Sequence, residues 1–233
     1  MQLDLAFRRN GGARRGAGRP ARGPRPSEPH KARPQFSKPL VAHCTLRVVD
    51  AVRPLRRPAA YHAVRGALGT LARRGDFRIT QLSLEIDHVH ALTEANTHTA
   101  LAKGMQAFQS SIAQRLNAAL ARRGPVFTDR YHARFITSPT QARHALAYIL
   151  NNWRRHRLDD GMETGQWDVD YYSSGPTFAH WKELADPAFT LDIPAAYKPL
   201  PVAQPKTWLL AVGFIRGGPP ISLYEVPGPA RKR

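Results

Sequence analysis

The chain contains a single cysteine, few acidic residues and no long hydrophobic run. Because Cys44 stands alone, an intrachain disulfide and a cysteine-based zinc site are both excluded, as is usual in a reducing cytoplasm. No stretch of about eighteen apolar residues occurs, so we expect no membrane contact through a spanning helix. The N-terminus lacks the apolar segment of a secretory signal, and we therefore expect a cytoplasmic protein.

The shortage of acidic residues leaves a large positive charge. Asp and Glu number 17 against 35 Lys and Arg, which gives a formal net charge of +18 at pH 7. An excess of this size indicates a polyanionic partner, most simply nucleic acid. The excess lies before residue 159, because residues 159–233 carry slightly more acidic than basic residues. We therefore expect a nucleic acid to bind the first two thirds of the chain, and the protein to be associated with the nucleoid.

The two ends of the chain are predicted to be irregular. Residues 1–39 are rich in Gly, Pro and Arg with almost nothing to bury, which is typical of a disordered basic arm. Around Arg19 this arm resembles the Gly-Arg-Pro core of AT-hook peptides, whose arginine lies in a narrow minor groove; a flexible cationic leader is the alternative. Residues 159–233 combine Pro- and Gly-rich joints with aromatic islands, and we expect this C-terminal extension to wrap the core, with residues 208–215 as an added buried segment.

The middle segment, residues 40–158, shows regular hydrophobic periodicity. It predicts strands at 41–49, 77–85, 87–93 and 131–137, and helices at 59–74, 97–123 and 139–158. Ser138 and Pro139 are a strong N-cap and first-turn pair for the last helix. The order β-α-β-β-α-β indicates an α+β, ferredoxin-like core with an antiparallel sheet, followed by one further helix that we expect to be catalytic.

A histidine pair lies in the middle of this core. In a strand, side chains alternate between faces, so His88 and His90 point the same way while Val89 points toward the core. Two imidazoles about 7 Å apart on one face make half of a metal site. The pair alone is weak evidence, because chance also produces this pattern.

The last core helix carries a tyrosine away from its apolar stripe. At 100° per residue, Tyr148 lies on the polar flank, and Asn152 is one turn further on the same side. A tyrosine hydroxyl near a metal ion and arginines is a competent nucleophile toward a phosphodiester. The alternatives are an exposed tyrosine with an ordinary helical amide, or a nucleophilic role for Tyr131 instead.

Three motifs together resemble the single-tyrosine HUH transposases, and especially the REP-associated tyrosine transposases. They are His88-Val89-His90, the segment 126–131 and Tyr148-Ile-Leu-Asn-Asn152, in this order within residues 40–158. The resemblance implies a DNA endonuclease and strand transferase that cleaves single-stranded or hairpin DNA of palindromic repeats through a 5′-phosphotyrosine. It also implies Mg²⁺ or Mn²⁺ held by His88, His90 and Asn152, Tyr148 as nucleophile, and a monomer or homodimer.

Further basic and aromatic residues near these motifs are expected to contact DNA. They are Arg19, Arg130, Tyr131, His132, Arg134, Arg154 and Arg155. His43 either lies near the metal ion or is an ordinary sheet histidine. A catalytically inactive DNA- or RNA-binding module of the same fold is the rival interpretation, although the central strands offer almost no exposed aromatics for base stacking. A histidine-based hydrolase of small phosphoesters would leave the basic charge unexplained.

Overall fold

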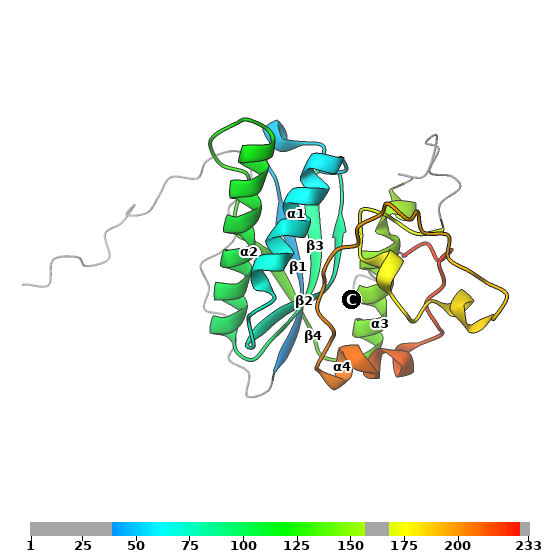
Figure 1. Ribbon diagram of the computed structural model, residues 1–233. Coiled ribbons are helices and arrows are strands. Elements are labelled where there is room, and N and C mark those ends of the chain that lie inside the picture. The colour runs from blue at the N-terminus through cyan, green and yellow to red at the C-terminus, as the bar shows by residue number, and fades with distance from the viewer. Residues whose placement is uncertain (1–38, 157–167, 229–233) are drawn as a thin grey trace, which may run out of the picture. The chain divides into compact units, whose positions relative to one another are not determined.

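A computed structural model describes residues 39–156 and 168–228, which fall within one compact unit (Figure 1). Its strands are β1 (Leu40–Arg47), β2 (Phe77–Leu84), β3 (His88–Ala95) and β4 (His132–Ile136), and its long helices are α1 (Pro58–Leu71), α2 (His98–Ala119) and α3 (Pro139–Arg155). All strand pairs are antiparallel, in the order β2-β3-β1-β4. The predicted ferredoxin-like α+β fold is therefore confirmed, with element ends shifted by a few residues. The basic arm before residue 39, with Arg19, lies outside the described residues.

Helices α1 and α2 lie side by side on one face of the sheet (Figure 1). Their apolar residues pack with Leu46, Val89 and other inward-facing strand residues into one buried cluster. Helix α2 approaches the start of β2 closely at Gly104, where a Cβ atom would lie only 2.2 Å from the ring of Phe77. A glycine in the middle of this helix, which weakens a helix by itself, is thus required by packing.

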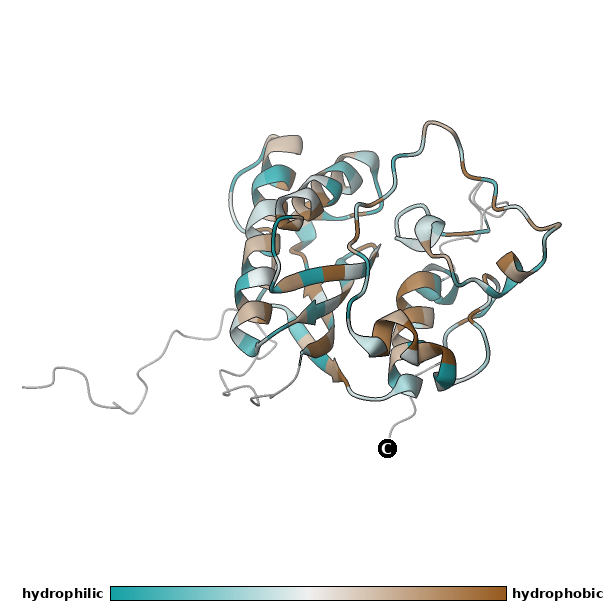
Figure 2. Ribbon diagram, turned by 60° about the horizontal axis from the view of Figure 1, so that its bottom comes forward, coloured by the Kyte–Doolittle hydropathy of each residue, from teal (hydrophilic) through white to brown (hydrophobic). Residues whose placement is uncertain are grey.

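Helix α3 covers part of the opposite face. Ser138 caps it by accepting a hydrogen bond from the backbone N–H of Gln141, and Pro139 follows in the first turn. Its predicted apolar stripe, which includes Leu146, Ile149 and Trp153, is buried. Figure 2 shows that the helices and strands carry both hydrophobic and hydrophilic residues, as amphipathic elements do. No helix in the described part of the chain is both long and apolar enough to cross a membrane.

The C-terminal extension packs against α3 and the edge strand β2, as expected. Between residues 168 and 228 it contains four short helical segments, η3 (Gly175–Thr177), η4 (Lys182–Ala185), α4 (Trp208–Ala211) and η5 (Gly213–Gly217). Backbone N–H groups of Ser174 and Ala203 donate to carbonyls of β2, and the N–H of Leu84 in β2 donates to Tyr172. Because an unpaired strand edge invites association with other chains, these contacts protect the sheet on this side.

The predicted buried segment at residues 208–215 is only half buried. Leu210 and Phe214 enter the core beside α3, whereas Trp208 and Ile215 are more than half exposed. The segment forms short helical turns instead of a strand, so only one of its sides can face the core. The apolar run WLLAVGFI was therefore misleading as a sign of complete burial.

An ion pair buried between the core and the extension gives a first prediction. Arg56 donates two hydrogen bonds, of 2.8 and 2.9 Å, to the carboxylate of Asp170, whose side chain is 1% exposed. Asp170→Ala would leave the Arg56 guanidinium buried without its partner, and we expect a loss of about 3–5 kcal/mol of unfolding free energy. Urea unfolding measures it. The control is Asp50→Ala, which removes an exposed ion pair with Arg53 and should cost less than about 1 kcal/mol; equal effects would contradict the prediction.

Candidate active site

The two histidines of β3 point at each other on the side of the sheet that α3 covers. The Nε2 atoms of His88 and His90 are 2.9 Å apart. Two ligands at right angles around a divalent cation, each about 2.1 Å from it, would be separated by about 3 Å. The spacing of the two nitrogens therefore fits ligands that converge on one ion.

The other nitrogen of His88 is held by a carboxylate. Its Nδ1 lies 2.6 Å from Oδ1 of Asp87, and the second carboxylate oxygen accepts from Arg47 and pairs with Arg53 at 3.2 Å. Burial opposes ionisation of Asp87, but the hydrogen bond to His88 and the nearby positive charges lower its pKa below the usual value. An ionised Asp87 fixes the imidazole so that Nε2 is the free nitrogen, as is common for metal-binding histidines.

His90 is oriented by strand β1. Its Nδ1 lies 3.0 Å from Nε2 of His43 and 3.2 Å from the hydroxyl of Thr45. Burial, followed by repulsion from His43 and His88, lowers the pKa of His90 well below its usual value. Burial also lowers the pKa of His43 to about 4, helped by the charges of Arg134 and His132. Both rings are therefore neutral near pH 7, which is the form of histidine that binds a metal ion.

The ring of Tyr148 lies against these imidazoles. Its centroid is 5.1 Å from that of His90 and 5.7 Å from that of His43. Burial raises the pKa of Tyr148; the guanidinium of Arg155, whose Cζ is 6.0 Å from the ring centroid, opposes this shift. The phenol is thus protonated near pH 7 and sits where a cation would favour its ionisation.

Asn152, one turn after Tyr148, is completely buried, and both its amide oxygen and nitrogen lack a hydrogen-bond partner within the described residues. The Glu85 carboxyl is near enough for Asn152 to affect its pKa, although no hydrogen bond of normal geometry joins them. Buried polar groups are normally paired. A buried, unpaired amide oxygen one turn after Tyr148 fits the role of a third metal ligand.

The residues present therefore fit a divalent cation. In the described segments, no cluster of three or more His, Cys, Asp and Glu residues could hold a metal ion. This finding does not bear on Asn152, because Asn is not among those residue types. Amide oxygen suits Mg²⁺ and Mn²⁺, whereas imidazole favours softer ions.

Part of the expected DNA surface lies beside this site. On β4, His132 pairs with Thr45 and Arg134 with His43 in the sheet register, and the side chains of His132 and Arg134 are exposed. These strand pairs place both side chains on the face that carries His43 and His90. Arg155 is exposed at the end of α3. Of these residues, Arg155 lies over the Tyr148 ring, and Arg134 lies near His43, which contacts that ring.

Two residues that the sequence predicted to contact DNA make contacts within the protein instead. Tyr131 is only 5% exposed and packs in the cluster under α1 and α2, on the other side of the sheet, which favours the packing alternative over stacking or nucleophilic attack. Arg154 donates to the carbonyls of Leu223 and Asp168 and lies over the ring of Trp153, so it anchors the C-terminal extension. Arg130 is exposed in the loop before β4.

Sequence reasoning missed two carboxylates at the site, Asp87 and Glu85. Burial, followed by repulsion from Asp170, raises the pKa of Glu85, and the Arg56 charge opposes the shift. Strand alternation would direct Asp87 away from His88, but Asp87 lies in the turn before β3, where alternation does not apply. The available signal was that Glu85 directly follows the alternating apolar residues of β2, with Asp87 two residues later.

The chain is similar to known transposases. Residues 40–152 match the family model described as "Transposase IS200 like". Among solved structures, a REP-associated tyrosine transposase bound to a REP hairpin is similar at 15% identity and a TM-score of 0.49, over 76% of this chain and 98% of that one. A protein from Deinococcus radiodurans R1, described as a candidate transposase, is similar at 17% identity and a TM-score of 0.36, over 48% of this chain and 89% of that one. No curated protein matches the chain.

The two structural similarities are too low to assign a function, so the family rests on the sequence match. That match begins at the first residue of β1 and ends at Asn152, and it includes both histidines and Tyr148. The transposase family indicated by the sequence motifs is confirmed: the domain formed by residues 40–152 belongs to the IS200-like transposases.

Proposed function

We propose that the protein cleaves and rejoins single-stranded DNA by transesterification at Tyr148. The observation that carries the proposal is the contact of the Tyr148 ring with His90 and His43, beside the converging nitrogens of His88 and His90. A nucleophile, a candidate cation site and the guanidinium of Arg155 thus lie close together. The direct test is a covalent protein–DNA adduct on a denaturing gel.

In the proposed step, the Tyr148 hydroxyl oxygen attacks the scissile phosphorus. A bond forms between this oxygen and phosphorus while the bond from phosphorus to the 3′ oxygen breaks. The products are a 5′-phosphotyrosine and a free 3′-OH, which takes up the proton that the phenol has lost. The phosphoester energy is kept in the new bond, so a second 3′-OH can reverse the attack and join a different strand.

His88, His90 and Asn152 are the residues that would hold Mg²⁺ or Mn²⁺. A bound divalent cation supplies positive charge to the non-bridging oxygens of the phosphate. Asp87 and His43 hold the two imidazoles so that both Nε2 atoms face the same point. Arg155 lies at the Tyr148 ring, where it favours the phenolate over the phenol.

The proposed ligand is single-stranded DNA next to a hairpin, held mainly through its backbone by the exposed basic residues around Tyr148. Arg134→Ala should weaken binding about equally for different sequences and lower the salt dependence of log K by about one unit of slope. Fluorescence anisotropy of a labelled hairpin over a salt series measures both. Arg73→Ala, an exposed arginine after α1, is the matched control and should change neither; equal effects of the two variants would place DNA elsewhere.

A further inference from the structure

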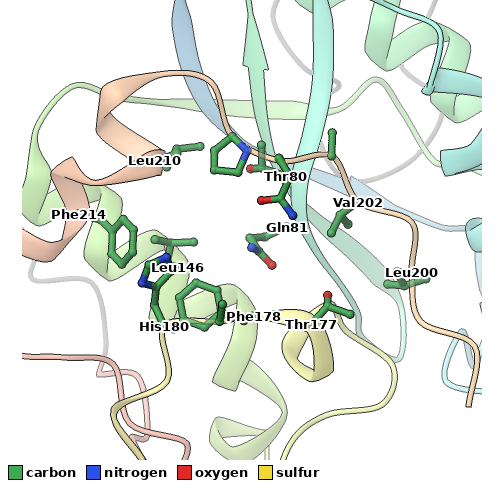
Figure 3. A pocket seen from close by; sticks show the side chains of 14 residues that line it. Thr80, Gln81, Leu146, Thr177, Phe178, His180, Leu200, Val202, Leu210 and Phe214 are labelled. Carbon is green, nitrogen blue, oxygen red and sulfur yellow. The ribbon is translucent and has the colours of Figure 1, made fainter. Parts of the chain in front are cut away.

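A cavity of about 270 Å³ lies between the edge strand β2, helix α3 and the C-terminal extension (Figure 3). The proposed transesterification uses none of its residues. At about 30 Å³ per water molecule in the liquid, its volume equals that of roughly nine waters. This room suits one planar ring system.

One wall of the cavity is aromatic. The ring centroids of His180 and Phe214 are 5.2 Å apart, and that of Phe178 is 5.7 Å from His180 and 6.3 Å from Phe214. Phe178 and Phe214 are buried, whereas His180 is exposed at the opening. Figure 3 shows these three rings across the cavity from Thr80 and Gln81. The exposed ring of His180, backed by the two phenylalanines, offers a face or an edge to another flat ring.

The cavity also offers unused hydrogen-bonding groups. The Gln81 side-chain oxygen accepts from the hydroxyl of Ser174, while its amide nitrogen has no partner within the described segments. Gln204 and the ring nitrogens of His180 likewise make no side-chain hydrogen bond within residues 39–156 and 168–228. Glutamine amides recognise adenine by donating to N7 and accepting from the N6 amino group. An aromatic wall with two amides is the combination that binds an unstacked base.

We propose that this cavity takes one unpaired nucleobase of the bound DNA, with adenine preferred. The inference rests on the proposed function in that single-stranded DNA is the ligand. Leu146 lines the cavity and lies two residues before Tyr148 in α3, so at 100° per residue the two side chains leave the helix on opposite sides. The base is therefore bound apart from the reacting phosphate, and Lys206, exposed next to the cavity wall, provides positive charge for the phosphate of that nucleotide.

The test compares DNA with and without bases. Probes are fluorescein-labelled dA, dC and dT strands of about twelve nucleotides and an abasic strand of the same length, measured by anisotropy with the full chain. We expect dA to bind about tenfold more tightly than the abasic strand, equivalent to about 1.4 kcal/mol. Gln204→Ala combined with His180→Ala should remove this preference and leave abasic binding unchanged. The control combines Gln106→Ala and His62→Ala, which are exposed on α2 and α1, and should keep the preference.

A second variant fills the cavity instead of removing its groups. Ala203 lines it, is exposed, and contributes only its backbone N–H to Ile79; Ala203→Trp should therefore also remove the preference for dA. Variants that bind dA as the parent chain does would overturn the proposal. So would free dAMP that binds this cavity as tightly as the dA strand, because the cavity would then be a free-nucleotide site. Tyr148→Phe should lose the covalent adduct but keep the preference for dA. The cavity proposal and the proposed chemistry can therefore be refuted independently of each other.

Discussion

Tyr148→Phe is expected to abolish the covalent protein–DNA adduct, a loss of more than about a thousandfold, while hairpin binding stays within a few-fold of the parent chain. The substitution removes only the hydroxyl. The ring contacts with His90 and His43 remain, and the Tyr148 hydroxyl makes no hydrogen bond in the described part of the chain. The variant should therefore fold as the parent does. A labelled oligonucleotide that stays attached to the protein through a denaturing gel measures the adduct.

The matched control is Tyr131→Phe, which removes the hydroxyl of the rival tyrosine. Because Tyr131 is buried on the other side of the sheet, this variant should form the adduct at close to the parent rate. The reverse result, an adduct that survives in Tyr148→Phe and disappears in Tyr131→Phe, would require the sheet to open and would refute the proposed site. Absence of an adduct in every chain, with hairpin binding retained, would favour the catalytically inactive binding module.

The sequence was sufficient for the fold because local signals agreed with one another. Alternation in the strands, the cap at Ser138 and the apolar stripe of α3 each depend on neighbouring residues. The histidine pair could also be assigned to one face, since strand alternation alone decides this. The contact between this pair and Tyr148 depends on the topology of the fold, and that topology could be predicted from the order of the elements.

The contacts between distant segments were beyond such reasoning. Nothing near Arg154 in sequence indicates that it bonds the carbonyl of Leu223, 69 residues later. The burial of Asn152 has a similar origin, because the packing of α3 against the sheet brings this residue near Glu85. His43 was left open between two roles, and only the pairing of β1 with β3 brings it to His90.

The second large effect concerns the metal ligands. His88→Ala combined with His90→Ala should reduce DNA cleavage by more than about a hundredfold, and EDTA should do the same to the parent chain. Hairpin binding should remain, because neither imidazole belongs to the exposed basic surface. The control is His62→Ala, which removes an exposed histidine of α1 on the opposite side of the sheet.

Asp87→Asn provides a finer test that does not depend on cleavage. An amide cannot supply the carboxylate charge that holds Nδ1 of His88, so affinity for Mn²⁺ should fall by about 10- to 100-fold while the histidines remain. Mn²⁺ titration followed by electron paramagnetic resonance measures this affinity directly, and the double histidine variant should show no specific binding. Cleavage that persists in EDTA, or Mn²⁺ affinity unchanged in both variants, would refute the assignment of His88 and His90 as ligands, and the phosphate charge would then have to be balanced by Arg134 and Arg155.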